Sequence, residues 1–179
     1  IHPHFLFNTI NNIYALARRK SEKTAPVALK LASLLRYVLY ESAKPSVRLA
    51  QEIQNLNDYV ELEKLRFDED RLSVKMTAET DDSDRQIPPL LLLPLVENAF
   101  KHGVSEKRTD AWVKIHISLT NNVLYCKVEN AKASDSTGDA KGIGLRNLRR
   151  QLELLYPDRH SLLISDTEDT FAAELRIDL

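Results

Sequence analysis

The sequence predicts an α+β protein in which an antiparallel helical hairpin precedes a two-layer α/β sandwich. Apolar residues recur at helical spacing up to about residue 67, and from residue 72 apolar and polar residues alternate as in half-buried strands. Residues 88–103 form an apolar run that ends in polar residues, which indicates a largely buried helix. With 179 residues and 43% hydrophobic content, the chain can bury a core of this kind.

Composition narrows the class of function. The net charge of −1 gives no indication of a nucleic-acid partner. Residues 1–45 carry seven basic and two acidic side chains, whereas residues 46–85 carry six and eleven, a contrast that suits a helical arm meeting another protein. A single cysteine, Cys126, excludes an internal disulfide and fits a reducing compartment. The longest apolar runs are too short to span a membrane, and because the chain begins without Met we expect a sensor or membrane segment upstream.

The first 46 residues predict two helices. Pro3 favours a start at residue 3 of a helix that runs to residue 20, and Pro26 favours the start of a second that runs to about residue 41. The apolar side expected of the first comprises Leu6, Ile10, Ile13 and Ala17, and that of the second comprises Leu29, Ala32, Leu35, Val38 and Leu39. A lone hairpin cannot bury both faces, so we expect a second copy to complete a four-helix bundle.

The rest of the chain divides into a linking segment, residues 47–70, and a sandwich domain, residues 71–179. The linking segment should be helical over residues 49–67, with Ile53, Leu56, Tyr59, Val60 and Leu65 as its apolar side. In the sandwich we expect strands at 72–77, 111–119, 123–130, 162–164 and 171–179. We also expect a tight turn at 121–122 and a polar loop at 132–141. The two expected helices, at 89–102 and 145–156, should lie on the same face of the sheet.

The helix at 89–102 carries the strongest functional signal. Pro89 can occupy the helix start, Pro94 is tolerated near it, and Gly103 suits the position just past the end. Its apolar residues predict burial, yet its last two turns carry Glu97, Asn98, Lys101 and His102. A triphosphate with its magnesium would supply partners for these groups; alternatively, this is a core helix whose polar end reaches water.

Two further clusters point to phosphate chemistry. His4 and Asn8 share one face of the first helix, where an exposed imidazole can act as a nucleophile toward phosphorus and Asn8 can orient a water; the alternative is a surface histidine at a frayed terminus. Gly142 and Gly144 open a helix, where backbone N–H groups can approach phosphate, although such a pair is often only a turn.

Together the motifs PHFLFN at residues 3–8, PLVENAFKHG at 94–103 and GIGLRN at 142–147 closely resemble those of the LytS-type sensor histidine kinases of bacteria. The resemblance covers nearly the whole chain and includes YVELEKLRF at residues 59–67, which looks like the linking helix of that family. It implies a helical dimerisation and phosphoacceptor hairpin followed by an ATP-binding domain of the GHKL or Bergerat type. It also implies ATP and Mg²⁺, a homodimer, a response-regulator partner of the LytTR type, and the cytoplasmic part of a bacterial inner-membrane protein.

The resemblance also assigns roles by position. His4 matches the phosphoacceptor, Asn98 the magnesium-binding asparagine, and residues 132–141 the ATP lid. Gly142 and Gly144, with Leu145 beside them, match the glycine box at the nucleotide, and Lys101 and His102 would face its phosphates.

One departure concerns the adenine site. Related kinases end their middle strand in Asp-x-Gly-x-Gly, whose aspartate accepts a hydrogen bond from the adenine amino group. Strand alternation places Asn130 at that position, in phase with Leu124, Cys126 and Val128. Its amide oxygen can still accept, without charge, and the missing glycines stiffen the turn.

The sequence therefore predicts a two-component histidine kinase core. His4 would attack the γ-phosphorus of Mg-ATP, and Glu97 would serve as general base because His4 has no acidic neighbour in the sequence. The alternatives are a non-catalytic scaffold of the same fold and an ATPase that leaves histidine unphosphorylated.

Overall fold

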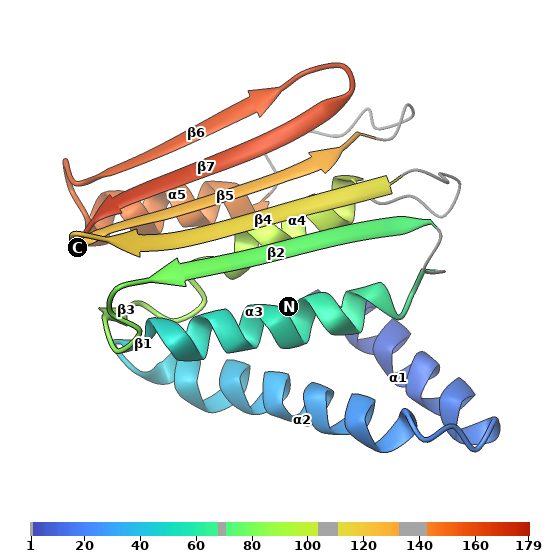
Figure 1. The fold of residues 1–179 in the computed structure, drawn as a ribbon. Helices are drawn as coiled ribbons and strands as arrows, with labels where there is room; N and C mark the ends of the chain where they lie inside the picture. The colour runs from blue at the N-terminus through green and yellow to red at the C-terminus, as the bar shows by residue number, and fades with distance from the viewer. Residues whose placement is uncertain (1, 68–70, 104–110, 133–142) are drawn as a thin grey trace.

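The computed structural model describes residues 2–67, 71–103, 111–132 and 143–179 (Figure 1). It confirms the predicted α+β class, with a helical hairpin before a two-layer sandwich. The elements follow in the order α1 (Pro3–Arg18), α2 (Thr24–Tyr40), the 3-10 turn η1 (Glu41–Ala43), β1 (Val47–Arg48), α3 (Leu49–Lys64), β2 (Leu72–Thr80), β3 (Gln86–Ile87), α4 (Leu93–Gly103), β4 (Ala111–Thr120), β5 (Val123–Ala131), α5 (Ile143–Leu155), β6 (His160–Asp166) and β7 (Thr170–Asp178).

The main sheet has five strands in the order β2-β4-β5-β7-β6, with β2 and β4 parallel and the other neighbours antiparallel. Helices α4 and α5 cover one face, as predicted (Figure 1). Side chains alternate along β4 and β5 between buried and partly exposed, because only this covered face belongs to the core. Asn121 and Asn122 join the two strands with φ of 51° and 64°, the tight turn that their sequence predicts.

Helix α2 buries a different side from the one we expected. Val27, Leu31, Leu34 and Tyr37 are buried, and α2 packs on α3. The predicted apolar side instead leaves Leu29 and Leu39 at the surface. On α1 the predicted Ile10 is 48% exposed, while Phe5 and Thr9 are buried. Both helices are apolar on two sides, and the sequence does not show which of these sides α3 covers.

Helix α3 ends at Lys64, three residues earlier than predicted, and it is buried on nearly all sides. Its buried residues include Leu56, Tyr59 and Val60, as expected. They also include four polar side chains that the sequence analysis did not place in the core: Glu52, Asn55, Asp58 and Glu63. Because α3 lies between the hairpin and the sandwich, it contacts α1, α2, α4 and β2 (Figure 1).

The prediction that α4 begins at Pro89 was wrong. The helix begins at Leu93, with Pro94 as its second residue, and Leu90 before it has a positive φ of 56°. The turn is held by Glu52, whose carboxylate oxygens accept the backbone N–H groups of Leu90 and Leu92, each at 3.1 Å, and the Tyr37 hydroxyl. Strand β3, which precedes this turn in the sequence, pairs with β1. Neither strand was predicted, because two-residue strands have no period to detect.

Candidate functional site

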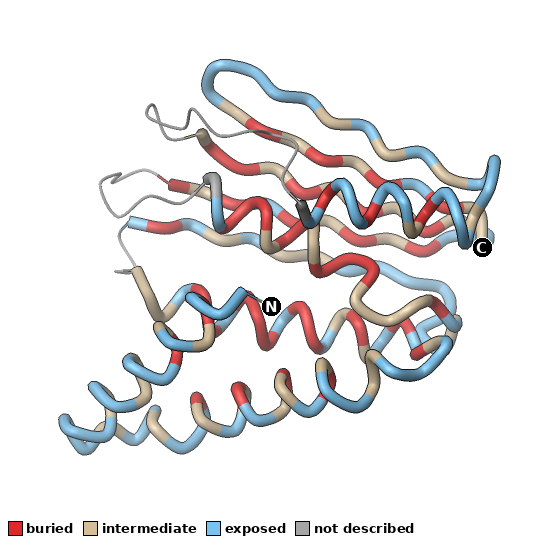
Figure 2. Tube along the Cα trace, turned by 180° about the vertical axis from the view of Figure 1, so that it is seen from behind, coloured by how far each residue is buried: buried red, intermediate tan, exposed pale blue. Residues whose placement is uncertain are grey.

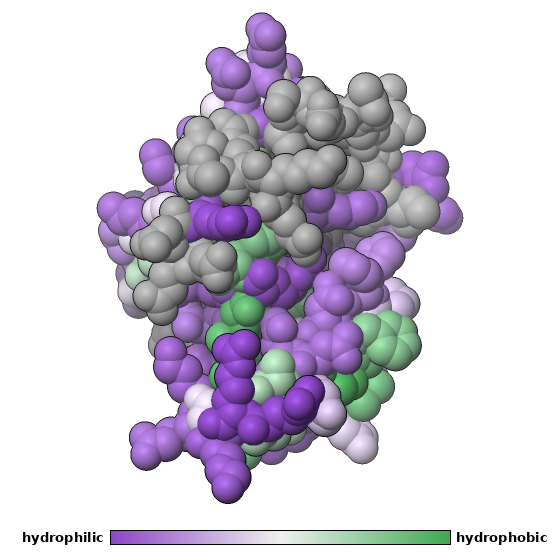
Figure 3. All heavy atoms as spheres, turned by 90° about the vertical axis from the view of Figure 1, so that its right-hand side faces the viewer, coloured by the Kyte–Doolittle hydropathy of each residue, from purple (hydrophilic) through white to green (hydrophobic). Residues whose placement is uncertain are grey.

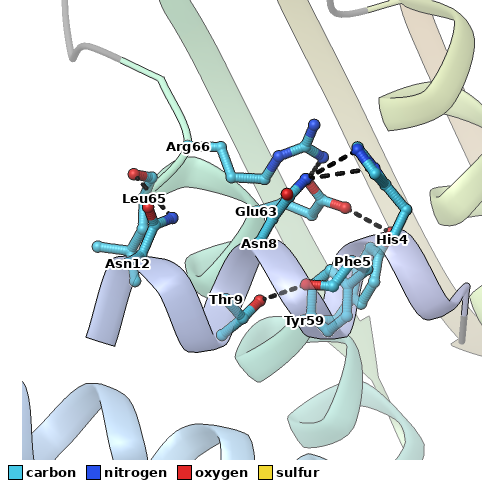
Figure 4. A network of polar contacts seen from close by, with 9 residues as sticks. All are labelled: His4, Phe5, Asn8, Thr9, Asn12, Tyr59, Glu63, Leu65 and Arg66. Carbon is cyan, nitrogen blue, oxygen red and sulfur yellow. Dashed lines mark hydrogen bonds and ion pairs between the residues drawn. The ribbon is translucent and has the colours of Figure 1, made fainter. Parts of the chain in front are cut away.

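His4 and Asn8 lie side by side on the exposed face of α1. Pro3 occupies the first helical position, where its missing N–H costs nothing. The Asn8 side-chain nitrogen lies 3.2 Å from Nδ1 and 3.3 Å from Nε2 of His4, so the amide sits against the imidazole ring (Figure 4). The imidazole itself is exposed and open to a reaction partner.

Helix α4 presents three of the predicted residues. The apolar residues predicted to be buried are buried: Leu91 and Leu92 in the turn before α4, and Leu95, Val96, Ala99 and Phe100 within it. Asn98 is also buried, with 9% exposed, whereas Glu97 is half-buried and Lys101 is exposed. His102 belongs to the last turn of α4, but its side chain lies outside the described residues.

Asn130 lies at the end of β5, in phase with the buried residues of that strand as predicted, and is fully buried. Its side-chain nitrogen donates to the Ala131 carbonyl at 2.9 Å, but its oxygen Oδ1 has no hydrogen-bond partner in the described parts of the chain. An orphaned buried acceptor costs about 1–3 kcal/mol. The end of β5 and the C-terminal end of α4 lie at the same end of the sheet (Figures 1 and 2), so Oδ1 offers an acceptor to a donor bound there.

The glycine box is described in part. Gly142 lies outside the described residues, whereas Gly144 is exposed in the first turn of α5 and Leu145 is buried. A Cβ added at Gly144 would lie 3.9 Å from Cβ of Pro94, so the starts of α5 and α4 are neighbours. Of the segment at 132–141 that matches the lid, only Lys132 is described, and its ammonium lies 2.7 Å from a carboxylate oxygen of Asp166 at the end of β6.

The negative charges of Glu97 and Glu63 both affect the hydroxyl of Tyr59. Burial foremost, and then the negative charges of Glu63 and Glu97, raise the pKa of Tyr59 well above its usual value. Tyr59 donates to Glu63 at 2.9 Å and stacks on Phe5, the residue after His4 (Figure 4). Tyr59 is therefore the residue that contacts the start of α1 and also feels the charge of Glu97 on α4. Glu63 and Tyr59 were missed as site residues because their spacing reads as an ordinary helix face.

A metal at this site would depend on few protein ligands. Among the described residues no group of three His, Cys, Asp or Glu side chains could hold a metal ion. The oxygen donor predicted for magnesium is the Asn98 amide, and Mg²⁺ commonly completes its shell with phosphate oxygens and water. A cavity of about 410 Å³ between α2 and α3 holds none of the predicted site residues.

The sequence of this chain matches those of known histidine kinases. A family model described as "Histidine kinase" matches residues 1–72. The sensor histidine kinase BtsS of Escherichia coli K12 is 33% identical over 174 residues, which cover 96% of this chain and 30% of that protein. The sensor protein LytS of Oceanobacillus iheyensis is 30% identical over 183 residues, which cover 94% of this chain and 31% of that protein.

The fold agrees with these matches. The solved histidine kinase domain of the blue-light activated kinase EL346 from Erythrobacter litoralis superposes with a TM-score of 0.55 at 16% identity, covering 99% of this chain and 95% of that one. The chain spans about a third of the length of BtsS and of LytS. The family match, the similarity over nearly the whole chain and the shared fold agree with the three motifs, and this chain belongs to the LytS-type sensor histidine kinases.

Proposed function

We propose that this chain is the kinase core of a two-component sensor: it binds Mg-ATP, transfers the γ-phosphoryl group to His4 and passes it to an aspartate of a response regulator. The observation that carries the proposal is the buried Oδ1 of Asn130, which lacks a partner in the described residues. It lies at the end of the sheet where α4 ends, and an adenine amino group is a donor that would satisfy it.

The neighbouring residues suit the rest of the nucleotide. Asn98 would hold the magnesium ion, which supplies neutralising charge between the phosphates when bound. Lys101 and His102 would face the phosphates, and the backbone at Gly142 and Gly144, beside Leu145, would approach them at the start of α5. Lys101 and Gly144 are both exposed, which is compatible with contact to a bound phosphate.

Transfer would proceed by direct displacement. A ring nitrogen of His4 attacks the γ-phosphorus with its lone pair, the bond from phosphorus to the bridging oxygen breaks, and ADP leaves with those electrons. The proton on the other ring nitrogen then passes to a base, for which Glu97 is our candidate. Asn8, packed against the ring, would keep the imidazole oriented and later orient a water toward the phosphorus of the phosphorylated imidazole.

The dimer and the larger protein are part of the same proposal. We divide the chain into a phosphoacceptor hairpin at 1–46, a linking helix at 47–70 and an ATP-binding domain at 71–179. Apolar side chains stand at the surface of the hairpin, which supports a four-helix bundle with a second copy: Phe7, Ile10, Tyr14, Leu29, Leu39 and Tyr40. Viewed from the end of the sheet where β5 ends, green apolar patches lie among hydrophilic ones in the lower half, over the hairpin (Figure 3).

The relatives named as sensors support a place for this chain in a bacterial inner-membrane protein, on the cytoplasmic side, with a LytTR-type response regulator as partner. Within the described ranges, none of the helices has the length and apolar character needed to cross a bilayer. The membrane segment that we propose upstream of this chain rests on the relatives named as sensors.

The test is incubation of the purified protein with γ-labelled ATP, with and without Mg²⁺, followed by mass spectrometry of the N-terminal peptide. We expect an acid-labile, base-stable label that requires Mg²⁺ and disappears in His4→Ala. His2→Ala is the matched control, since His2 is an exposed neighbour outside the helix, and it should be labelled like the wild type. Undiminished label in His4→Ala would refute the assignment, and ATP hydrolysis without any protein label would favour the ATPase alternative.

A further inference from the structure

Three buried aromatic rings connect the phosphoacceptor helix to the helix that carries the nucleotide-binding residues. Phe5 of α1, Tyr59 of α3 and Phe100 of α4 are each 3% exposed. Phe5 and Tyr59 stack with ring centroids 4.8 Å apart and planes at 27°, and Tyr59 meets Phe100 edge-on at 6.0 Å and 80°. Both are favoured aromatic geometries, so the three rings form one continuous contact from α1 to α4.

Tyr59 is held in place at its hydroxyl as well as at its ring. The hydroxyl donates to Oε1 of Glu63 at 2.9 Å, and Arg66 donates to the other oxygen, Oε2, at 2.6 Å (Figure 4). Glu63 is buried, so this carboxylate depends on both donors. Asn12 adds a second link between the helices by donating to the Leu65 carbonyl at 3.4 Å.

The ends of this contact stand next to the proposed chemistry. His4 directly precedes Phe5, Lys101 directly follows Phe100, and Asn98 lies two residues before it. Because Tyr59 contacts both Phe5 and Phe100, it also fixes the position of the His4 imidazole relative to the residues expected to hold the phosphates. Phosphoryl transfer is sensitive to such placement, because a displacement of about 1 Å can cost on the order of a hundredfold in rate.

We propose that Tyr59, held by Glu63, is a positioning residue for phosphoryl transfer: its ring docks the start of α1 against α4 so that His4 meets the nucleotide. This inference rests on the proposed kinase function and adds to it a residue from the linking helix. Tyr59 touches neither substrate nor the reacting atoms, so it acts through Phe5 and Phe100.

The experiment measures the rate of His4 phosphorylation and the KM for ATP in four variants. Tyr59→Leu and Phe5→Leu each remove one ring, and we expect the rate at saturating ATP to fall on the order of tenfold to a hundredfold while the KM stays close to that of the wild type. Tyr59→Phe keeps the stack and removes the hydroxyl that donates to Glu63, so it should recover most of the rate while lowering the stability of the fold. Tyr125→Leu is the matched control, since Tyr125 is an aromatic residue of β5 that lies out of phase with the buried residues of that strand, and it should behave like the wild type.

Each outcome decides the inference. Wild-type rates in both Tyr59→Leu and Phe5→Leu would overturn it, and faster labelling in either would mean that the rings restrain His4, which also overturns it. A rise in KM equal to the loss in rate would indicate damage to the nucleotide site and count against a positioning role. If Tyr59→Leu fails to fold by circular dichroism, Phe5→Leu decides, because it leaves the Tyr59–Phe100 contact in place. Absence of label in the wild type would instead refute the proposed function, and this inference with it.

Discussion

Replacing Glu52 should destabilise the fold at the turn that sets the start of α4. The side chain is fully buried, and its two oxygens accept three donors: the backbone N–H groups of Leu90 and Leu92 and the hydroxyl of Tyr37. In Glu52→Gln one oxygen becomes an NH₂ donor, so at least one buried donor loses its acceptor, at a cost of about 1–3 kcal/mol. In Glu52→Ala all three lose their acceptor and a void remains, at a cost of roughly 3–5 kcal/mol.

The assay is urea denaturation followed by circular dichroism, from which the free energy of unfolding of each variant is obtained. Asn57→Ala is a suitable control, because Asn57 lies on the same helix, α3, and is exposed. The reasoning is refuted if Glu52→Ala unfolds within about 0.5 kcal/mol of the wild type, the range typical of surface substitutions.

Glu52 also gives a pH dependence with a definite sign. Burial raises the pKa of its carboxyl above 4.5, against the opposing effect of the hydrogen bonds from Tyr37, Leu92 and Leu90. A raised pKa in the folded state means that the folded protein binds this proton more tightly than the unfolded chain. The resulting stability is complete below pH 4.5 and is lost as pH rises through the raised folded value. The wild type should therefore lose stability relative to Glu52→Gln as pH rises above 4.5, and a difference independent of pH would contradict the shift.

Three further outcomes are expected. Ile10→Asp places a charge on the exposed apolar side of α1 and should weaken the proposed dimer at least tenfold by light scattering, with unchanged circular dichroism; an unaltered dimer would count against this face. Gly144→Ala should keep the melting temperature, because its Cβ would only touch Pro94 at 3.9 Å, but should weaken ATP binding; equal affinity would remove the glycine from the phosphate site. Cys126 is fully buried and burial raises its pKa to about 12, so a thiol reagent should label it only when the protein unfolds, and rapid labelling of the native protein would disprove that.

The sequence predicts the sandwich well because strand alternation and turn residues are local signals. Asn121 and Asn122 adopt the positive φ that their side chains tolerate, and the alternation through β5 places Asn130 correctly on the buried face. The same local signals place α5 and the strands that follow it to within a few residues.

The start of α4 could not be predicted, because its cause is not local. Leu90 is a good helix former, yet it takes a left-handed conformation because Glu52, 38 residues earlier, accepts its N–H. The burial of Glu63 likewise follows from Tyr59 and Arg66 rather than from its own spacing, which is that of a solvated helix face. Helical spacing identified α2 correctly, but it could not decide which of two apolar sides α3 would cover.

The most direct test of the kinase assignment is the melting temperature of the wild type and of Asn130→Leu, each with and without Mg-ATP. At a nucleotide concentration near a hundred times Kd, binding adds about 2.7 kcal/mol of stability, which raises the Tm of a chain of this size by roughly 5–10 °C. We predict that rise in the wild type, and a clearly smaller one in Asn130→Leu at the same concentration, because the leucine offers the adenine amino group no acceptor. Equal rises in the two proteins, or none in the wild type, would contradict a nucleotide bound beside Asn130.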